Sequence, residues 1–592
     1  MKINILTLLI IFSFINIGVF AQFGGGSGTE QDPYRLYTSA DIYELADSLD
    51  LSNTFTGRYF RLMNNIEEPI NRLGVQFFDG SFNGGGHSIN IDLEGPIHCV
   101  FSGIGINGIL DSLKIIGNTD YFLSLVCGNS GIIRNCTCDI TVMNPYLTSC
   151  LYPICNINAE TGLVESCVNL TNFINEDIEQ EELALICGAG ICYMNYGTIR
   201  KCINKGNTRI RHGDFAGLVR ENWGLVESCI NVGNIIVTDS TIYPYQFSGG
   251  IVGSAFPYSI VRNCINTGNM VIFSTTVSGG IVGDMFYNAH YSFVENCLNL
   301  GEIYGYVDES YEASGGGIVG LYSSGLLVDS IEYGVCNNVK NCLNISNNGG
   351  GNIIADTSII SALCLSNNYY DKQMGINKGL ISEDHIGIAE GKLTTQLIGT
   401  SPELQAMLGD GWSYAEGRYP IPLGLENDSM ALLAATPIYL PYEDQDNYNT
   451  VDSVTCHFTL GTENNVEWTS NPSQIELIQS ENELKGVLQT TGFANLSAYL
   501  DGFTKNILLN IKSICQPDYK KEEIQKTQIT AYPNPTKDIL YFNQASAYEI
   551  YDLQGKLVMK SNKPQNFVNT AELKPGMYII KIGEEVIKFE VE

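Results

Sequence analysis

Basic side chains are scarce in this sequence. Its 592 residues include 32 lysines and arginines against 64 aspartates and glutamates, which gives a formal net charge of −32 at pH 7. Nucleic acid is therefore excluded as a partner, because phosphate binding depends on clustered basic side chains. A strongly acidic surface instead suits an exported protein that must stay soluble.

Motifs that carry chemistry are lacking as well. Only six histidines occur, and none lies in a His-Glu-x-x-His pattern or beside a second histidine, so a zinc hydrolase is not indicated. The sequence has no Cys-x-x-Cys pair for zinc or redox chemistry, no Gly-x-Ser-x-Gly elbow and no phosphate-binding loop. We therefore predict no enzyme activity, no catalytic residue, no metal site and no cofactor.

Long apolar runs are missing except at the start. Lys2 precedes an apolar run from Leu6 to Phe20, and Ala21 ends a small-residue pattern before Gln22. These features predict a signal peptide over residues 1–22. No later stretch is apolar enough to cross a bilayer, so we expect an exported mature chain without a membrane span.

What the sequence does contain is a repeat built around cysteine. Each of seven cysteines, 27 to 45 residues apart, has isoleucine or valine three positions before it. Asparagine stands two positions after every one except the first. The cysteines are Cys136, Cys167, Cys202, Cys229, Cys264, Cys297 and Cys342. Self-similarity at this period predicts a solenoid, propeller or array.

The repeat unit consists of short apolar pieces separated by Gly and Asn, with no stretch long enough for a helix. One piece is the Ser-Gly-Gly-Ile-Val-Gly of residues 248–253, another the segment ending at the cysteine, and a third Ile235–Val237. Three short strands per repeat predict one coil of a right-handed parallel β-helix, in which equivalent strands stack about 4.8 Å apart. That spacing is too wide for an unstrained disulfide, so we expect a ladder of free buried thiols beside a ladder of asparagines.

Charges two positions before the cysteines alternate in sign through all seven copies. They are Arg134, Glu165, Arg200, Glu227, Arg262, Glu295 and Lys340. If the coils stack in register, each charge lies between two opposite ones, whereas like charges on adjacent strands would be destabilising. Exposed ion pairs contribute little to stability, so we interpret the alternation as a device that fixes register.

Aromatic residues stand six positions before four consecutive cysteines. They are Tyr196, Trp223, Tyr258 and Tyr291, and nearby loops add Tyr193, Phe256, Phe286 and Tyr287. In stacked coils the four rings would align about 5 Å apart along one corner. Such a row could bind a glycan or a host or bacterial surface protein, because Trp and Tyr are favoured at binding surfaces. The alternative is that the rings only stack on one another and stabilise the coil.

Helical patterns flank the repeats. Thr38–Asp50 predicts a helix that caps the N-terminal end of the solenoid core, and Leu393–Leu408 with the segment to Pro422 predicts a second cap. These limits predict a solenoid domain over residues 23–424.

This region resembles bacterial surface proteins with GLUG-type repeats. The resemblance lies in the Gly-Thr-Glu-x-Asp-Pro-Tyr of residues 28–34, the Phe-Asn-Gly-Gly-Gly-His-Ser-Ile of residues 82–89, and the Gly-Gly-Ile-Val-Gly and Asn-Cys-x-Asn-x-Gly-Asn units. It implies a β-helix that serves as a structural or binding, adhesin-like protein. The alternative function is that of a polysaccharide lyase or glycoside hydrolase, which β-helices also host.

Residues 425–515 differ in character, with seven short strand candidates separated by turns, and predict a β-sandwich. The run from Gly492 to Gly502 resembles the late hairpin of bacterial immunoglobulin-like domains. Cys456 and Cys515 are the candidates for a disulfide in this domain.

A charged linker is predicted over residues 516–529, followed by a second small β-sandwich over residues 530–592. This last domain closely resembles the type A sorting domain of the Bacteroidetes type IX secretion system. The motif residues are Pro533, Asn534, Pro535, Asp552, Gly555, Lys556, Gly576 and Tyr578. The resemblance implies recognition by the type IX machinery, removal of the domain near the linker, and attachment to the cell surface or release.

Overall fold

The computed structural model describes most of the chain from residue 23 onward. The described ranges are 23–49, 53–70, 75–93, 99–119, 124–142, 151–175, 186–210, 213–238, 247–273, 277–285, 291–306, 315–321, 337–346, 353–354, 363–372, 384–437, 450–452, 457–460, 467–470, 475–479, 484–488, 492–500, 503–512, 531–582 and 585–592. The predicted signal peptide, the linker, Phe286, Tyr287, Cys456 and Cys515 lie outside these ranges. Contacts divide the chain into two compact units, Met1–Ala435 and Thr436–Glu592.

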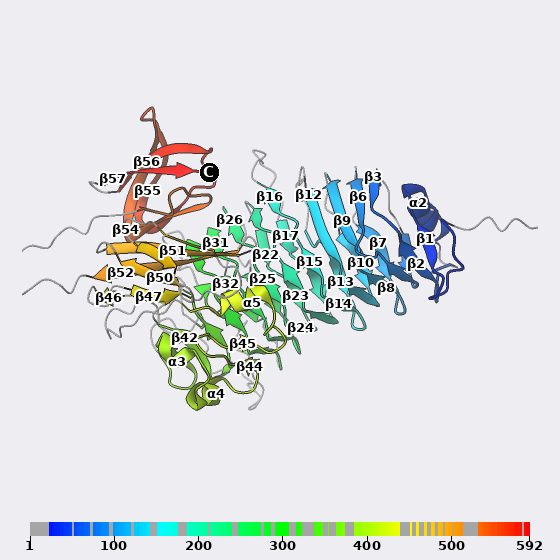
Figure 1. Ribbon diagram of the computed structural model, residues 1–592, viewed down its shortest axis with the longest axis horizontal. Helices are drawn as coiled ribbons and strands as arrows, with labels where there is room; N and C mark the ends of the chain where they lie inside the picture. Colours follow the sequence, from blue (N-terminus) through cyan, green and yellow to red (C-terminus); the bar gives the residue numbers. More distant parts are fainter. Residues whose placement is uncertain are drawn as a thin grey trace, which may run out of the picture. The chain divides into compact units, whose positions relative to one another are not determined.

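The first unit is a parallel β-helix, which confirms the predicted fold class (Figure 1). Three long sheets form its walls, and within each sheet every strand pairs in parallel with its copy in the next coil. The strands of sheet A, in spatial order, are β1 (Tyr34–Leu36), β2 (Tyr59–Leu62), β5 (Ser81–Asn83), β8 (Ile109–Asp111), β11 (Ile132–Arg134), β14 (Leu163–Glu165), β19 (Thr198–Arg200), β24 (Leu225–Glu227), β29 (Ile260–Arg262), β34 (Phe293–Glu295), β39 (Asn337–Lys340) and β41 (Leu363–Ser366).

Sheets C and D form the other two walls. Sheet C contains β3 (Ile66–Ile70), β6 (Ser88–Leu93), β9 (Lys114–Thr119), β12 (Thr137–Val142), β15 (Val168–Asn169), β20 (Ile203–Asn204), β25 (Ile230–Asn231), β30 (Ile265–Asn266), β35 (Leu298–Asn299), β40 (Leu343–Asn344), β42 (Asn368–Asp371) and β43 (Ala389–Lys392). Sheet D contains β4 (Val75–Phe78), β7 (Cys99–Ile104), β10 (Ser124–Asn129), β13 (Cys155–Asn158), β18 (Cys192–Asn195), β23 (Val219–Asn222), β28 (Val252–Ala255), β33 (Val282–Met285) and β38 (Val319–Leu321).

The core confirms the predicted interior positions. The isoleucine or valine three positions before each repeat cysteine is fully buried, and so is the cysteine itself. All seven cysteines are free thiols, as predicted. Each thiol contacts the carbonyl oxygen two residues earlier at 3.2 to 3.4 Å. The small apolar thiol therefore fills the interior and also donates to a backbone acceptor at the bend.

The bend between sheets A and C is sharp in every repeat because the residue before the cysteine has a left-handed backbone conformation. Its φ lies between 51° and 55° at Asn135, Ser166, Lys201, Ser228, Asn263, Asn296 and Asn341. Asparagine tolerates this region better than most residues, which accounts for its frequency at this position.

Coils in the middle of the solenoid have five strands rather than the three that we predicted. Two additional sheets enclose a second apolar core, formed by residues such as Phe173, Ile210 and Phe215. Sheet F contains β16 (Phe173–Asn175), β21 (Thr208–Ile210), β26 (Ile235–Val237), β31 (Met270–Phe273) and β36 (Ile303–Tyr306). Sheet E contains β17 (Ile186–Ala189), β22 (Gly213–Ala216), β27 (Phe247–Gly249), β32 (Val277–Gly279) and β37 (Gly315–Gly316).

An asparagine ladder lies at the end of the sheet C strands, where the chain continues to sheet F. The amide of each asparagine two positions after a cysteine donates to the next at 2.7 to 2.9 Å, from Asn169 to Asn344. Glycines lie directly against it: a Cβ on Gly250 would come within 2.4 Å of Asn266 Cγ, and one on Gly280 within 2.4 Å of Asn299 Cγ. The Gly-Gly motif therefore packs directly against the Asn motif, and a side chain at these glycines would not fit.

A disulfide that we did not predict joins two neighbouring coils. Cys99 and Cys127 are bonded, with their Cα atoms 5.5 Å apart. Cys187 is disulfide-bonded as well.

Both ends of the solenoid are closed. At the N-terminal end, α2 (Ser39–Ser48) has a capping box between Thr38 and Asp41 and buries Ile42 and Leu45 in the main core, as predicted. At the other end, the predicted helical stretch forms two helices, α3 (Thr394–Leu397) and α4 (Pro402–Leu408), which are separated near Gly399.

A closing hairpin, residues 411–424, then returns along the A–C bend. It contains β44 (Trp412–Ser413) and β45 (Ile421–Pro422) and precedes α5 (Ser429–Ala434). Trp412 Nε1 donates to Asn341 O at 3.1 Å, and Ser228 Oγ donates to Leu423 O at 3.3 Å. The hairpin therefore contacts bends in coils that are far apart in sequence.

The second unit consists mainly of antiparallel strands. The described strands between residues 450 and 512 form two sheets, with β46 (Thr450–Asp452), β52 (Phe503–Lys512), β51 (Gly492–Leu500) and β48 (Glu467–Ser470) in one, and β47 (His457–Leu460), β50 (Leu484–Leu488) and β49 (Ile475–Gln479) in the other. The last domain contains β53 (Ala531–Tyr532), β54 (Ile539–Asp552), β55 (Leu557–Asn569), β56 (Gly576–Ile582) and β57 (Glu585–Val591). Within the described residues, the helices are too short or too polar to cross a membrane.

Candidate binding site

The bend between sheets D and A carries the aromatic residues that the sequence singled out. A short asparagine ladder leads into it, with amides that donate at 2.8 Å from Asn129 to Asn158, from Asn158 to Asn195, and from Asn195 to Asn222. Tyr196 and Trp223 follow directly after Asn195 and Asn222, so the ladder fixes where these two rings leave the coil.

Tyr196, Trp223 and Phe256 occupy equivalent positions in three consecutive coils. The backbone N–H of Trp223 donates to Asn195 O at 2.8 Å, and that of Phe256 donates to Asn222 O at 2.9 Å. The Tyr196 and Trp223 rings stack with centroids 4.8 Å apart, and those of Trp223 and Phe256 are 3.8 Å apart. Both faces of the Trp223 ring are therefore covered by neighbouring rings.

This arrangement corrects the predicted single row of four rings. Phe256, not Tyr258, lies opposite Trp223, because four steps separate Phe256 from Ile260 where two separate Trp223 from Leu225. We had aligned the rings by their distance from the cysteine, and that alignment does not allow for the two additional residues in this bend.

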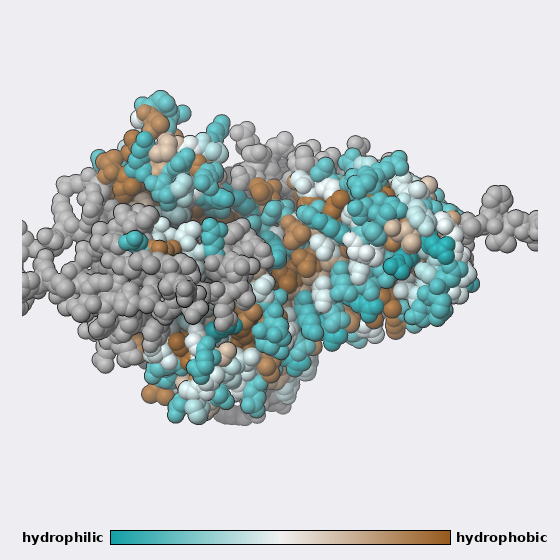
Figure 2. All heavy atoms as spheres, viewed as in Figure 1, coloured by the Kyte–Doolittle hydropathy of each residue, from teal (hydrophilic) through white to brown (hydrophobic). Residues whose placement is uncertain are grey.

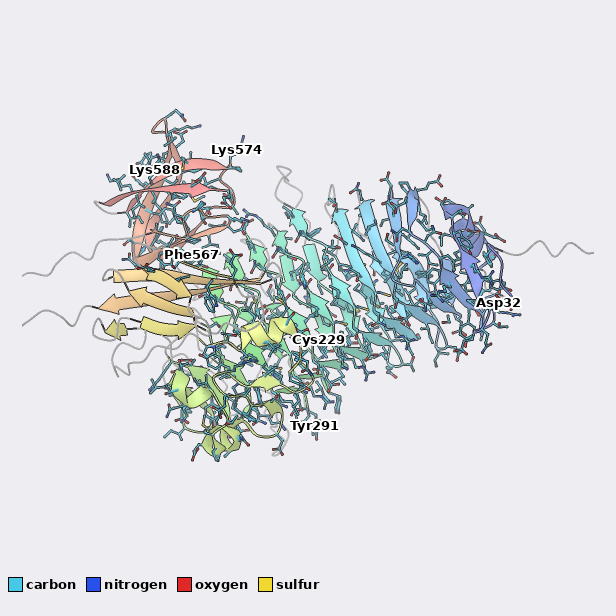
Figure 3. All side chains as sticks on the ribbon, viewed as in Figure 1. Asp32, Cys229, Tyr291, Phe567, Lys574 and Lys588 are labelled. Carbon is cyan, nitrogen blue, oxygen red and sulfur yellow. A yellow bond between two sulfur atoms is a disulfide. The ribbon has the colours of Figure 1, made fainter. Side chains whose placement is uncertain are left out.

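Tyr258 and Tyr291 form a separate stacked pair. Their ring centroids are 5.6 Å apart and their planes differ by 12°. Tyr258 is 67% exposed and Tyr291 is 47% exposed, and both have a left-handed backbone, with φ of 66° and 63°. Figure 3 shows Tyr291 at the margin of the coils. A bulky side chain in this backbone region is strained, and such strain is concentrated at functional sites.

Sheets D and E together carry a cluster of charged residues that we did not predict. The Arg220 guanidinium donates to the Asp214 carboxylate and, at 3.2 Å, to Ser254 Oγ. Burial raises the pKa of Glu221, although the Arg220 charge opposes that shift. Burial also raises the pKa of Tyr193, and the Glu221 charge adds to the effect. No sequence motif marks this cluster, because its members come from several strands.

The cluster does not have the geometry of a nucleophilic site. An arginine cannot act as the base for Ser254, because it has no acceptor atom and stays protonated. Among the described residues, no group of three or more His, Cys, Asp or Glu side chains is placed to hold a metal ion.

The sorting-motif residues hold the last domain together. Asn534 accepts from the Glu590 N–H at 2.8 Å and donates to Lys588 O at 3.1 Å, which ties the start of the domain to β57. The peptide bonds before Pro533 and Pro535 are cis.

The remaining motif residues shape two turns. Asp552 Oδ1 accepts from the Lys556 N–H at 2.9 Å, and Gly555 in the same turn has a φ of 81°. The Tyr578 hydroxyl donates to Lys574 O at 2.8 Å, next to Gly576 with its φ of 153°.

Comparisons with known proteins bear on this last domain. Residues 530–590 match the family model of a secretion system C-terminal sorting domain. No curated protein matches the chain.

Among solved structures, one similar chain is a candidate immunoglobulin A1 protease from Bacteroides ovatus. It shares 15% sequence identity over 68% of this chain and 95% of that chain, with a TM-score of 0.26, which carries no argument about function. The match to the sorting domain shows where the protein goes. This domain engages the type IX secretion machinery and directs the protein to the cell surface or out of the cell.

Proposed function

We propose that this exported protein is a structural, adhesin-like protein that binds a partner through Tyr258 and Tyr291. The observation that carries this proposal is the strained, exposed and stacked geometry of the pair. Trp223 has a structural role and does not bind the partner, because both faces of its ring already pack against other rings. The tyrosine pair keeps ring surface and hydroxyl groups available for a glycan chain or a surface protein.

Many polar side chains of the coils are engaged with one another. The interior asparagines donate to one another, and the charges beside the cysteines pair between coils. These interactions support a scaffold, and they support our proposal that the protein is not an enzyme.

The tyrosine pair can be tested by replacing both rings. Tyr258→Ala with Tyr291→Ala should abolish adhesion to cells or to arrayed glycans and leave the melting temperature nearly unchanged. Ile106→Ala is the matched control, because Ile106 is also 67% exposed and lies on the D–A side of an earlier coil. Full adhesion by the double variant would overturn the proposal.

A polysaccharide lyase or glycoside hydrolase remains the second candidate. The buried Arg220 cluster, in which the pKa of Glu221 is raised by burial, is the observation that favours it. Incubation of purified protein with host and plant polysaccharides, with calcium present, should release no product. Sustained turnover that Glu221→Gln removes would replace the adhesin proposal with the enzyme.

A further inference from the structure

The outer face of sheet A carries two parallel rows of side chains. The first is the charged row two positions before the cysteines, which the structure extends to Asp111, the register partner of Arg134. The second lies two residues earlier in each strand and is half-buried and mainly apolar. Its described members are Ile109, Ile132, Leu163, Thr198, Leu225, Ile260 and Phe293.

The charged row has eight members, alternates throughout and stops at both ends. Asn83 lies beside Asp111 at one end, and Ser366 lies beside Lys340 at the other. Within the row each acid pairs with the base of the next coil, at 2.8 Å for Glu165–Arg200 and 3.0 Å for Glu295–Lys340. The basic side chains are 37 to 43% exposed and the acids 14 to 24%, so both signs reach the surface.

An even number of alternating charges has a consequence for self-association. Reversing the row exchanges its acidic end for its basic end, so the reversed row is complementary to the original at every position. A two-fold axis along the strand direction performs this reversal when two sheet A faces meet with antiparallel solenoid axes. The opposed pairs would be Asp111 with Lys340, Arg134 with Glu295, Glu165 with Arg262 and Arg200 with Glu227, each in both directions.

The same axis brings the apolar row onto itself except at its two ends, where Ile109 would face Asn338, the register partner of Phe293. Ile132 would face Phe293, Leu163 would face Ile260, and Thr198 would face Leu225 of the second copy. The smallest residue of the row therefore lies beside the axis and the largest lies away from it. A symmetric interface requires one surface that is complementary to itself, and this face meets that requirement in charge throughout and in apolar content from Ile132 to Phe293.

We propose that the outer face of sheet A binds a second copy of this chain in an antiparallel, two-fold dimer. A uniformly charged polymer is a poorer occupant, because the four acids and four bases of the row give it no net charge. A partner must instead match the alternation, and the reversed chain does so.

The size of the face predicts a weak dimer. Eight strands span about 34 Å at ~4.8 Å per step, and each is short, so the buried area falls below the ~800 Å² per partner of a standard stable interface. We expect a concentration-dependent dimer with a dissociation constant on the order of micromolar. Crowding on a cell surface would favour such an association.

Cross-linking distinguishes the antiparallel dimer from other arrangements. Ile132→Cys and Phe293→Cys are prepared as separate full-length variants without residues 1–22, and a short bismaleimide is added to each and to their mixture. Covalent dimers should form in the mixture and not with either variant alone, because two copies of position 132 would lie about 24 Å apart along the axis. The parent protein is the control, since its described free thiols are buried.

Sedimentation velocity over a range of concentrations provides the second measurement. Leu225→Lys should abolish the dimer, whereas Ile174→Lys should leave it intact, because Ile174 is 56% exposed in sheet F. Circular dichroism and thermal melting show whether each variant folds. A parent chain that stays monomeric at high concentration, or a cross-link between two copies of position 132, would overturn the proposal.

Discussion

Trp223 stacks on Phe256, with ring centroids 3.8 Å apart and planes that differ by 17°, and not on Tyr258, which has the same spacing from its cysteine. The rings of the D–A bend therefore divide into an enclosed stack and an exposed pair. Figure 2 shows hydrophilic residues over much of the solenoid surface in view, interrupted by hydrophobic residues in the middle coils.

The enclosed stack should stabilise the fold. Trp223→Ala removes a half-buried ring and two stacking contacts, and we expect a loss of roughly 2 kcal/mol, below the 3–5 kcal/mol typical of fully buried rings. Chemical denaturation measures the change. Tyr258→Ala is the control and should cost far less, because most of its side chain is already exposed. Equal losses in the two variants would contradict the division into stack and pair.

The contact between the glycines and the asparagine ladder should tolerate no added methyl group. A Cβ on Gly250 would lie 2.1 Å from Gly280 O, so Gly250→Ala should prevent folding of the middle coils. Gly128→Ala is the matched control, because its nearest neighbour would be Ser102 O at 3.9 Å. Circular dichroism of both variants tests the expectation, and a normally folded Gly250→Ala would contradict it.

The buried thiols of Cys138 and Cys167 should be unreactive in the folded protein. Burial raises the pKa of Cys138 and Cys167 above the usual value of 9.0, so the reactive thiolate is suppressed. Iodoacetamide at pH 8 should label these thiols only after denaturant is added, as mass spectrometry can show. Because the folded pKa is raised, the contribution of these thiols to stability should be constant below pH 9 and fall as the pH rises above it. Rapid labelling of the native protein would disprove the closed core.

The first acid of the charged row should contribute to stability in a pH-dependent way. Burial alone would raise the pKa of Asp111, but hydrogen bonds from Asn135, Ser112 and Arg134 hold it below 3.8. A depressed pKa stabilises the fold above the unfolded value and loses this effect as the pH falls through the folded value. The difference in unfolding free energy between the parent and Asp111→Asn should therefore shrink below about pH 4. Asp92→Asn, at an exposed aspartate, should show a smaller difference at neutral pH.

Removal of the sorting domain should stop export. A chain that lacks residues 530–592 should accumulate in the periplasm, because the type IX machinery has nothing to engage. Tyr578→Phe, which loses only the hydroxyl bond to Lys574 O, is the control and should still be exported. Mass spectrometry of the mature C-terminus should place the cut between residues 516 and 530. Surface display of the truncated chain would contradict this assignment.

The charge alternation and the thiol ladder could be predicted because both depend only on the repeat period. Arg200 pairs with Glu165 at the position that the spacing implies. The ring row could not be predicted in the same way, because a bend can gain two residues without changing the strands on either side. The second apolar core, between sheets E and F, was not predicted. The sequence of the strand Ile235–Val237 would be equally apolar if this strand closed a single core or lined a second one.

Long-range contacts could not be deduced from the sequence. Nothing in the sequence links Trp412 to Asn341 or Ser228 to Leu423, since these contacts are made once and carry no period. The Arg220 cluster was missed for the same reason, because Asp214 and Ser254 come from different coils. The resemblances of the repeats to GLUG-type proteins and of residues 425–515 to immunoglobulin-like domains stay predictions.

The closing hairpin changes how the solenoid should respond to a pulling force. Coils that contact only their neighbours can peel away one at a time from an end. The hairpin instead connects the bend at Ser228 with that at Asn341, so the coils between them are held as a block. Tension applied from the C-terminal side must first detach residues 411–424, and only then can the last coils unwind.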